Sequence, residues 1–344
     1  SRLVAKGFSE ILGQSYEANE VYAPVCSYDT LRTMLSVANQ KNWNLYQADI
    51  SNAYLQSDLP RPQYMQQPPG FEQRDENGEK LICRLQKGLY GTKSGGYHLY
   101  RTLNAFMKGL GFKQLTGDAC FYQLRVERPE PDERAAAEGG LADTVGLHGE
   151  PPAGELWVIT YVDDLSIAAS NDDIYRWFVN HLGSKFPINH TESGELDWIS
   201  SMRVQRDRQA GTLKLTQDAA IIKLYESLGL DGEIRGPSRT PMSTSRLLKV
   251  PEPEVLKDEF DYLSVLGSIL HINLLTRPDI SFAVNSLTRH AARPGKLHVK
   301  ALKRVVRYLY DTKDIGVTYY RDGHDCTPEV FEGGVHPLTT PDNH

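Results

Sequence analysis

The segment LWVITYVDDLSIAA, residues 156–169, places the adjacent carboxylates of Asp163 and Asp164 between two apolar runs. The runs Leu156–Tyr161 and Leu165–Ala169 have the length and composition of two strands of a hairpin. Two neighbouring carboxylates in an apolar setting raise each other's pKa, and a divalent cation relieves their repulsion. Because Mg²⁺ prefers hard oxygen ligands, the segment predicts a hairpin for two-metal phosphoryl transfer. The alternative is that Asp-Asp only supplies the residues of a β-turn.

Another carboxylate follows a second predicted strand upstream. Residues Trp43–Ile50 alternate as a half-buried strand does, with Asp49 near the end of the strand. Four and five residues after Asp49 come a small residue, Ala53, and an aromatic one, Tyr54. This arrangement resembles the first palm motif of reverse transcriptases. With the Asp-Asp hairpin, the chain is similar to the reverse transcriptase domain of copia-type LTR retrotransposon Pol polyproteins.

The resemblance covers residues 1–321, and its landmarks follow one another in the order that the family has. Besides the two Asp motifs, they are Arg2–Phe8, Tyr22–Val25, Asp29–Arg32, Tyr64–Phe71, Leu89–Gly91, Gly194–Leu196, Leu275–Ile280 and Lys303–Leu309. Each landmark alone is weak, but the ordered set is specific to the family.

The resemblance implies an RNA-directed DNA polymerase that extends a primer 3′-hydroxyl. Its catalytic and metal-binding residues would be Asp49, Asp163 and Asp164, holding two Mg²⁺ ions for which Mn²⁺ can substitute. Asp164 either contacts one ion or only shapes the field, because neighbours on a strand point to opposite faces. The implied partners are an RNA or DNA template–primer, deoxynucleotides and other segments of a Pol polyprotein.

The resemblance also implies contacts with the incoming nucleotide and the primer. Tyr54 would lie beneath the sugar and exclude a ribose 2′-hydroxyl; alternatively, it is a core aromatic residue. Lys6 and Arg2 would neutralise triphosphate charge; alternatively, they are exposed cations. The remaining implied contacts are Ile50, Ala53 and Ser94 with the nucleotide, and Tyr161 and Val162 with the primer terminus.

Two segments depart from the family pattern. In Thr92–Leu99, Ser94 stands where the family has a Gln, and the consecutive Gly95 and Gly96 predict a loosened segment. In Trp198–Ser201, two serines stand where the family has a tight turn with Gly. The departures fit either a folded but catalytically decayed copy that retains nucleic-acid binding, or a lineage with its own solution.

Composition is that of an intracellular enzyme. The chain has 344 residues, of which 40% are hydrophobic, and no apolar run approaches the roughly 18 residues of a transmembrane helix, so no membrane partner is expected. It begins Ser1-Arg2 without a signal-peptide pattern, which suggests a cut through a longer polyprotein. The four cysteines have no metal-type spacing. We expect a cytoplasmic virus-like particle and, in addition, the nucleus as locations.

The net charge of −6 is unevenly distributed along the chain. Residues 127–155 contain eight acidic and two basic residues and are rich in Pro, Gly, Ala and Glu, which predicts a disordered insertion. Residues 271–321 contain ten Lys or Arg against three Asp. Within them, Lys300, Lys303, Arg304 and Arg307 lie on one helical stripe, predicted to follow the template–primer backbone. The alternative is a solvated helix face.

The expected fold is an α+β polymerase right hand with an antiparallel palm sheet backed by helices. The fingers would comprise residues 1–45 and 56–105, and the palm 46–55 and 106–205. A helix Asn171–Leu182 would back the sheet, with Asn171 and Asp172 as the two candidate N-caps. Residues 206–321 would form the thumb and its C-terminal extension, including a helix Gln217–Leu228. Residues 322–344 would be a tail too short for a ribonuclease H domain.

Overall fold

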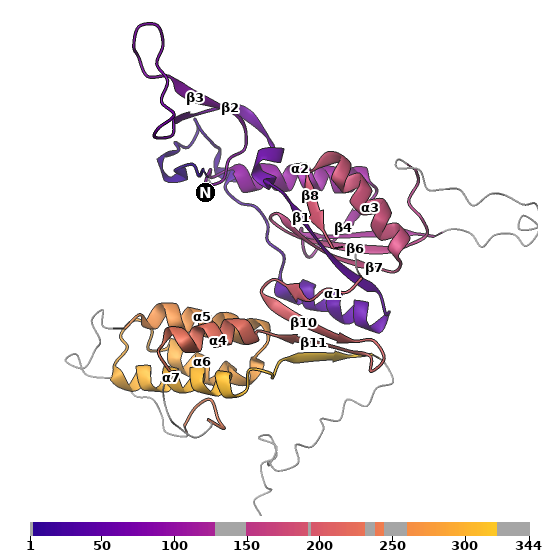
Figure 1. Ribbon diagram of the computed structural model, residues 1–344, viewed down its shortest axis with the longest axis vertical. Helices are drawn as coiled ribbons and strands as arrows, with labels where there is room; N and C mark the ends of the chain where they lie inside the picture. The colour runs from indigo at the N-terminus through magenta and orange to yellow at the C-terminus, as the bar shows by residue number, and fades with distance from the viewer. Residues whose placement is uncertain (1–2, 128–148, 192–193, 231–237, 244–259, 322–344) are drawn as a thin grey trace, which may run out of the picture.

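The computed structural model describes residues 3–127, 149–191, 194–230, 238–243 and 260–321. Arg2, most of the predicted insertion at 127–155 and the predicted tail at 322–344 lie outside the described residues. Along the long axis of the molecule, a projecting hairpin, a large sheet with its helices and a helical module follow one another (Figure 1). Among the described residues, no helix has the length and apolar character to cross a membrane.

The central element is a six-stranded sheet in the order β4-β5-β6-β7-β1-β8, and every pairing in it is antiparallel. Its strands are β1 (Asn44–Ile50), β4 (Lys113–Gln114), β5 (Phe121–Val126), β6 (Gly154–Tyr161), β7 (Asp164–Ala169) and β8 (Ile188–His190). The predicted antiparallel sheet is thereby confirmed, and so are the three predicted strands, which are β1, β6 and β7. β6 and β7 form the predicted hairpin, and β1 pairs with β7.

Alternation along the strands gives the sheet two buried faces. On one face, Tyr46, Ala48 and Ile50 pack with the helices α2 (Gly95–Gly109) and α3 (Asp172–Lys185). Of the two candidate N-caps, Asn171 caps α3: its side chain accepts a hydrogen bond from the Ile174 N–H at 3.0 Å, and Asp172 is the first residue of the helix. On the other face, Leu45 packs with the helix α1 (Tyr28–Gln40).

Helix α1 lies between the large sheet and a second antiparallel sheet, in the order β12-β11-β10-β9 (Figure 1). Its strands are β9 (Trp198–Ile199), β10 (Met202–Asp207), β11 (Thr212–Thr216) and β12 (Val317–Tyr320). The predicted palm boundary at residue 205 falls inside β10, and α1, predicted as part of the fingers, contributes to the core beneath this second sheet. Helix and sheets share one apolar cluster, so α1 joins them.

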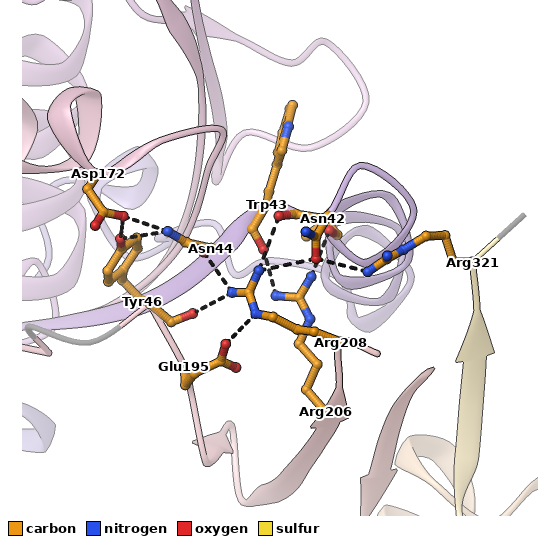
Figure 2. A network of polar contacts seen from close by, with 11 residues as sticks. Asn42, Trp43, Asn44, Tyr46, Asp172, Glu195, Arg206, Arg208 and Arg321 are labelled. Atoms are coloured by element: carbon orange, nitrogen blue, oxygen red, sulfur yellow. Dashed lines mark hydrogen bonds and ion pairs between the residues drawn. The ribbon is translucent and has the colours of Figure 1, made fainter. Parts of the chain in front are cut away.

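Three arginines fasten the second sheet to the point where α1 passes into β1 (Figure 2). Arg206 donates to the carbonyl oxygen of Trp43 at 2.6 Å. Arg208 donates to Asn44 Oδ1 at 2.6 Å and pairs with Glu195. Arg321, directly after β12, donates to Asn42 Oδ1 at 2.8 Å. Burial lowers the pKa of Arg206 to about 10, which still leaves it charged at neutral pH.

The helical module is inserted between the neighbouring strands β11 and β12. It contains α4 (Asp218–Ser227), α5 (Tyr262–Leu275), a short 3₁₀ turn η5 (Pro278–Ile280), α6 (Ser281–Thr288) and α7 (Lys296–Asp311) around its own apolar core. The predicted helix Gln217–Leu228 is thus confirmed as α4, with one residue fewer at each end.

The Thr-Arg-Pro-Asp segment between α5 and α6, residues 276–279, contains a buried arginine that bonds to its surroundings. Arg277 is fully buried and holds Asp279 through Nε and Nη2, at 2.9 and 2.8 Å. It also donates to the carbonyl oxygen of Thr312, after α7, at 2.9 Å. Burial acts to raise the pKa of Asp279, but the bonds from Arg277 hold it below its ordinary value. This motif therefore locks three helices together.

The projecting hairpin pairs β2 (Asp58–Gln66) with β3 (Ile82–Lys87). The N-terminal segment, with the 3₁₀ turns η1 (Gly7–Ser9) and η2 (Ala18–Glu20), joins its base: Arg61 of β2 pairs with Glu17 at 2.8 Å and Glu20 at 3.3 Å. A further 3₁₀ turn, η3 (Ala53–Gln56), leads from β1 to β2.

Candidate active site

The structure brings the three predicted aspartates together at one end of the large sheet. Asp49 of β1 lies directly opposite Asp164 of β7. Asp163 lies in the two-residue turn between β6 and β7, and its carbonyl oxygen accepts a hydrogen bond from the Ile50 N–H at 2.9 Å. Because directly opposed residues project to the same face, Asp164 shares the face of Asp49, while the turn presents Asp163 beside them.

The electrostatics of the cluster favour a cation. Burial raises the pKa of Asp164, and the charges of Asp163 and Asp49 raise it further, against a hydrogen bond from Gln47 that lowers it. In the part of the chain that the structure describes, no three His, Cys, Asp or Glu side chains form a ready-made metal cluster. Mg²⁺ commonly takes one or two carboxylates and completes its shell with water and substrate phosphates. The aspartates fit an ion that shares its ligands with a bound phosphate.

The tip of the hairpin is strained and exposed. Val162 has a φ of +59°, a left-handed conformation that is rare for a β-branched residue. Such a conformation costs on the order of 1–3 kcal/mol. The side chains of Tyr161 and Val162 are 41% and 37% exposed beside the carboxylates. Tyr161 and Val162, the two residues predicted to contact the primer terminus, are therefore accessible to a ligand at the tip of the hairpin.

Tyr54 lies within electrostatic reach of the cluster. Burial raises the pKa of its phenol, and the charge of Asp163 raises it further. Its ring packs against Tyr90, with centroids 4.4 Å apart, and against the start of α2. A Cβ at Gly95 would lie 2.7 Å from Tyr54 Cδ1. Gly95 is buried at the start of α2, and its missing side chain makes room for the Tyr54 ring, whereas the loosening expected from Gly95 and Gly96 stays a prediction.

Three predicted nucleotide contacts are core residues. Ile50 and Ala53 are 1% and 0% exposed and pack in the apolar cluster beneath α2 and α3. Ser94 is 0% exposed, and its hydroxyl lies 3.4 Å from Gln63 Nε2. The placement does not support side-chain contacts from these residues to a nucleotide. For Ile50, the strand alternation already indicated the buried face.

Lys6 is exposed at the N-terminal segment, which packs against the loop before α2. The Ala5 N–H donates to the carbonyl oxygen of Tyr90 at 2.7 Å, and a Cβ on Gly7 would lie 2.2 Å from the carbonyl oxygen of Gly91. Because Tyr90 also packs on Tyr54, the segment carrying Lys6 is tied to the surroundings of Tyr54.

Two residues near the site were not predicted. Burial raises the pKa of Tyr28, and the charge of Tyr161 in the Asp hairpin raises it further. The Tyr28 ring meets His271 of α5 edge-on, with centroids 6.3 Å apart. Neither residue belongs to a chemical motif, and the folding brings Tyr28 of α1 and His271 of α5 together.

The basic stripe of α7 is partly engaged within the helical module. Lys300 is exposed, whereas Lys303 Nζ lies 5.7 Å from the ring centroid of Phe260. Arg304 donates to Thr240 Oγ1 at 2.8 Å, and Arg307 is partly buried. Leu302, Val305, Val306 and Leu309 form the buried face of the helix, as predicted.

Comparisons with known proteins find similarity to one protein family and to the Pol polyproteins of plant transposons. Residues 1–127 match a family model described as "Reverse transcriptase (RNA-dependent DNA polymerase)". The chain is 30% identical over 317 residues, 92% of its length, to the "Retrovirus-related Pol polyprotein from transposon RE2" of Arabidopsis thaliana, and spans 19% of that protein. It is 28% identical over 318 residues, 91% of its length, to the TNT 1-94 Pol polyprotein of Nicotiana tabacum, and spans 22% of it. No solved structure matches the chain.

Proposed function

Since the chain belongs to the reverse transcriptase family of copia-type Pol polyproteins, we propose that it is an RNA-directed DNA polymerase acting by two-metal nucleotidyl transfer. The observation that carries this proposal is the convergence of Asp49, Asp163 and Asp164, with the pKa of Asp164 raised by burial and by its neighbours. Its partners would be a template–primer and deoxynucleotides. Because the chain spans only 19% of the RE2 polyprotein, the other Pol segments are proposed partners too.

The proposed architecture is a right hand. The six-stranded sheet with α2 and α3 would be the palm, the β2–β3 hairpin with the N-terminal segment the fingers, and the α4–α7 module the thumb. The order of the three parts along the long axis supports this architecture, since the sheet that carries the aspartates lies in the middle (Figure 1).

In the proposed reaction, the primer 3′-hydroxyl forms a bond to the α-phosphorus of the nucleotide, and the bond to pyrophosphate breaks. Asp49, Asp163 and Asp164 would hold two Mg²⁺ ions, which when bound lower the pKa of the hydroxyl and neutralise charge on the leaving group. Tyr54 would support the sugar from the α2 side. Lys6 would add positive charge toward the triphosphate, and Tyr161 and Val162 would flank the primer terminus.

The second candidate function is nucleic-acid binding by a catalytically decayed copy. The observation that favours it is Ser94, which stands where the family has a nucleotide-contacting Gln and is fully buried. The two candidates differ in one respect, since only the first requires nucleotide incorporation.

Primer extension separates the two candidates. The chain is incubated with poly(rA)/oligo(dT) and dTTP, with Mg²⁺ and then with Mn²⁺, and binding of the same template–primer is measured alongside. We expect metal-dependent extension. Binding without extension in either metal would establish the decayed copy instead.

Asp163→Asn provides the residue-level test of this function. The substitution keeps the carbonyl oxygen that anchors the Ile50 N–H, so the fold should survive. Losing several kcal/mol of metal-dependent stabilisation implies a drop in extension on the order of 10³-fold or more. Asp314→Asn, an exposed aspartate after α7, is the matched control and should extend normally. Near-normal extension by Asp163→Asn would end the metal assignment.

A further inference from the structure

A glutamine of the projecting hairpin reaches the start of α2. Gln63 of β2 is 5% exposed. Its Nε2 donates to the carbonyl oxygen of Ser15 at 2.9 Å and lies 3.4 Å from the hydroxyl oxygen of Ser94. Because a carbonyl oxygen only accepts, the amide nitrogen must face Ser15, which fixes the orientation of the side chain. Gln63 thus joins β2 to the N-terminal segment and to the residue before α2.

The amide of Gln63 is incompletely paired in its buried position. Among the described residues, its Oε1 is buried and has no hydrogen-bond partner. A buried acceptor without a partner destabilises the fold, and an apolar side chain of similar size would avoid this cost. Arg61, on the same side of β2, already ties the hairpin to the N-terminal segment through Glu17 and Glu20. Anchoring of the hairpin therefore does not explain the amide, and the contact with Ser94 remains.

The side chain of Ser94 serves this contact rather than its own helix. Ser94 is the N-cap residue of α2, where a serine normally accepts a hydrogen bond from the first turn of the helix. Here its side chain makes no capping hydrogen bond. Its fully buried hydroxyl lies by the amide of Gln63 instead. The start of α2 is therefore held from β2.

The two glycines after Ser94 connect its position to the candidate active site. A Cβ on Gly95 would lie 2.7 Å from Tyr54 Cδ1, and one on Gly96 would lie 3.6 Å from the Tyr54 hydroxyl oxygen. Tyr54 and Gly96 also line a cavity of about 50 Å³ together with Val162, from the tip of the Asp hairpin. A shift of the start of α2 would therefore move the surface against which the Tyr54 ring packs.

We propose that Gln63 supplies from β2 the amide that position 94 lacks. It is a positioning residue that fixes the start of α2, and through it the ring of Tyr54, for the incoming deoxynucleotide. The effect on the nucleotide rests on the proposed polymerase function; the support of α2 does not. Where the family has a glutamine, this chain has Ser94, with a glutamine facing it from another strand. The departure at Ser94 is then a compensated exchange rather than a loss.

The test is a double-mutant cycle on the full chain that moves the glutamine from one position to the other. Gln63→Ser removes the amide. Ser94→Gln places a long side chain where Gln63 already fills the buried space. The double variant again has one glutamine and one serine at the two positions. Ser94→Ala removes only the hydroxyl that Gln63 faces, and Gln66→Ser, at an exposed position of the same strand, is the matched control.

Two quantities are measured: KM and kcat for dTTP on poly(rA)/oligo(dT), and amide hydrogen exchange in residues 92–97 without substrate. We expect Gln63→Ser and Ser94→Ala each to speed exchange and to raise KM by about threefold to tenfold, the range of one hydrogen bond. The kcat should be nearly unchanged, because the aspartates are untouched. Ser94→Gln alone should impair both quantities, whereas the double variant should bring them close to those of the unaltered chain. Gln66→Ser should change neither.

Additive losses in the double variant, or an unchanged KM in Gln63→Ser, would overturn the proposal. If Gln63→Ser does not fold, Ser94→Ala decides, since it leaves Gln63 in place: unchanged exchange and KM in that variant would also overturn the proposal.

The two proposals fail separately. If the unaltered chain extends nothing, the polymerase function falls, and the exchange cycle still decides whether Gln63 holds the start of α2. If the chain extends normally and the cycle shows no coupling between positions 63 and 94, the role of Gln63 falls and the polymerase function stands.

Discussion

At the scale of single residues, Asp164 concentrates the unfavourable charge of the site. It lies opposite Asp49 and next to Asp163, and both burial and these charges raise its pKa. Because the folded-state pKa lies above the ordinary value of 3.8, the ionised group destabilises the fold. That destabilisation is absent below pH 3.8, grows as the pH rises from there, and is complete above the raised folded-state pKa.

Asp164→Asn should therefore raise the melting temperature of the metal-free chain at neutral pH. The difference from the unaltered chain should vanish as the pH falls toward 3.8. Mg²⁺ with a bound nucleotide should narrow the difference at neutral pH. Thermal unfolding across pH measures the effect, with Asp314→Asn as the control. A gap that stays constant with pH would contradict the assigned charge cluster.

Tyr54 sets the second residue-scale prediction. If its ring supports the sugar, Tyr54→Val should raise ribonucleotide relative to deoxyribonucleotide incorporation by on the order of tenfold or more, because a shape filter of this kind is lost. Gly95→Ala tests the same ring without changing it. The alanine Cβ would lie 2.7 Å from Tyr54 Cδ1 and so displace the ring. Both variants are compared in single-nucleotide incorporation assays. Unchanged discrimination in Tyr54→Val would make Tyr54 a core residue only.

The residue-scale expectations succeeded where chemistry and periodicity agreed. Asp49, Asp163 and Asp164 lie together because strand alternation and the hairpin turn fix their positions. Ser94 differs, because position in a motif does not reveal burial: its hydroxyl meets Gln63 from β2, a contact across 31 residues of sequence. The relation of Asp164 to Asp49 also needed the register of β1 on β7, which no local pattern contains.

At the scale of elements, the basic residues of the amphipathic helix α7 differ in whether they are exposed or already bonded within the helical module. Its apolar face builds the module core, while Arg304 is already bonded to Thr240. Replacing Lys300, Lys303 and Arg307 with Gln should weaken template–primer binding without sequence preference. The slope of log K against log salt should shrink by about 0.9 for each lost phosphate contact.

The comparison variant for this experiment is Arg304→Gln. Because Arg304 is held by Thr240, its loss should change the salt slope less than the loss of Lys300 does. Titrations over a range of salt concentrations give both slopes. If the triple variant binds with the unaltered slope, the stripe is a solvated helix face.

The elements themselves were largely predictable. β1, β6, β7, α3 and α4 follow from alternation, helical periodicity or a cap, and their observed bounds lie within a few residues of the expected ones. The β9–β10 turn departs from the family pattern in its two serines, and the hydroxyl of Ser201 lies 3.4 Å from His271, 70 residues further along the chain. A contact between residues so far apart in the chain cannot be predicted from the local sequence.

At the scale of the whole molecule, α1 and the arginines of Figure 2 make the two sheets one structure. Arg208→Ala removes bonds to Asn42, Asn44 and Glu195 at once. Hydrogen bonds that involve a charged group contribute about 1.5–3 kcal/mol each, so we expect a loss of at least that order in the free energy of unfolding.

Urea unfolding followed by tryptophan fluorescence and by circular dichroism measures this loss. The two signals should shift together, because the shared core leaves no sheet to unfold alone. Arg125→Ala, at a 61% exposed side chain paired with Glu127, is the control and should change little. Separate transitions in the two signals would show that the sheets are independent.

The insertion of the helical module between β11 and β12 has a consequence for the timing of assembly. β12 pairs with β11 from Thr212↔Tyr320 to Leu215↔Val317, across the whole module. During synthesis, α1 leaves the ribosome early, yet part of its cover is the last strand described. The local contacts of the module can form first, whereas closure of the sheet must wait for nearly the entire chain. Until then, the part of α1 that meets β12, where the Asn39 side chain donates to the carbonyl oxygen of Tyr319 at 3.2 Å, is exposed to premature association.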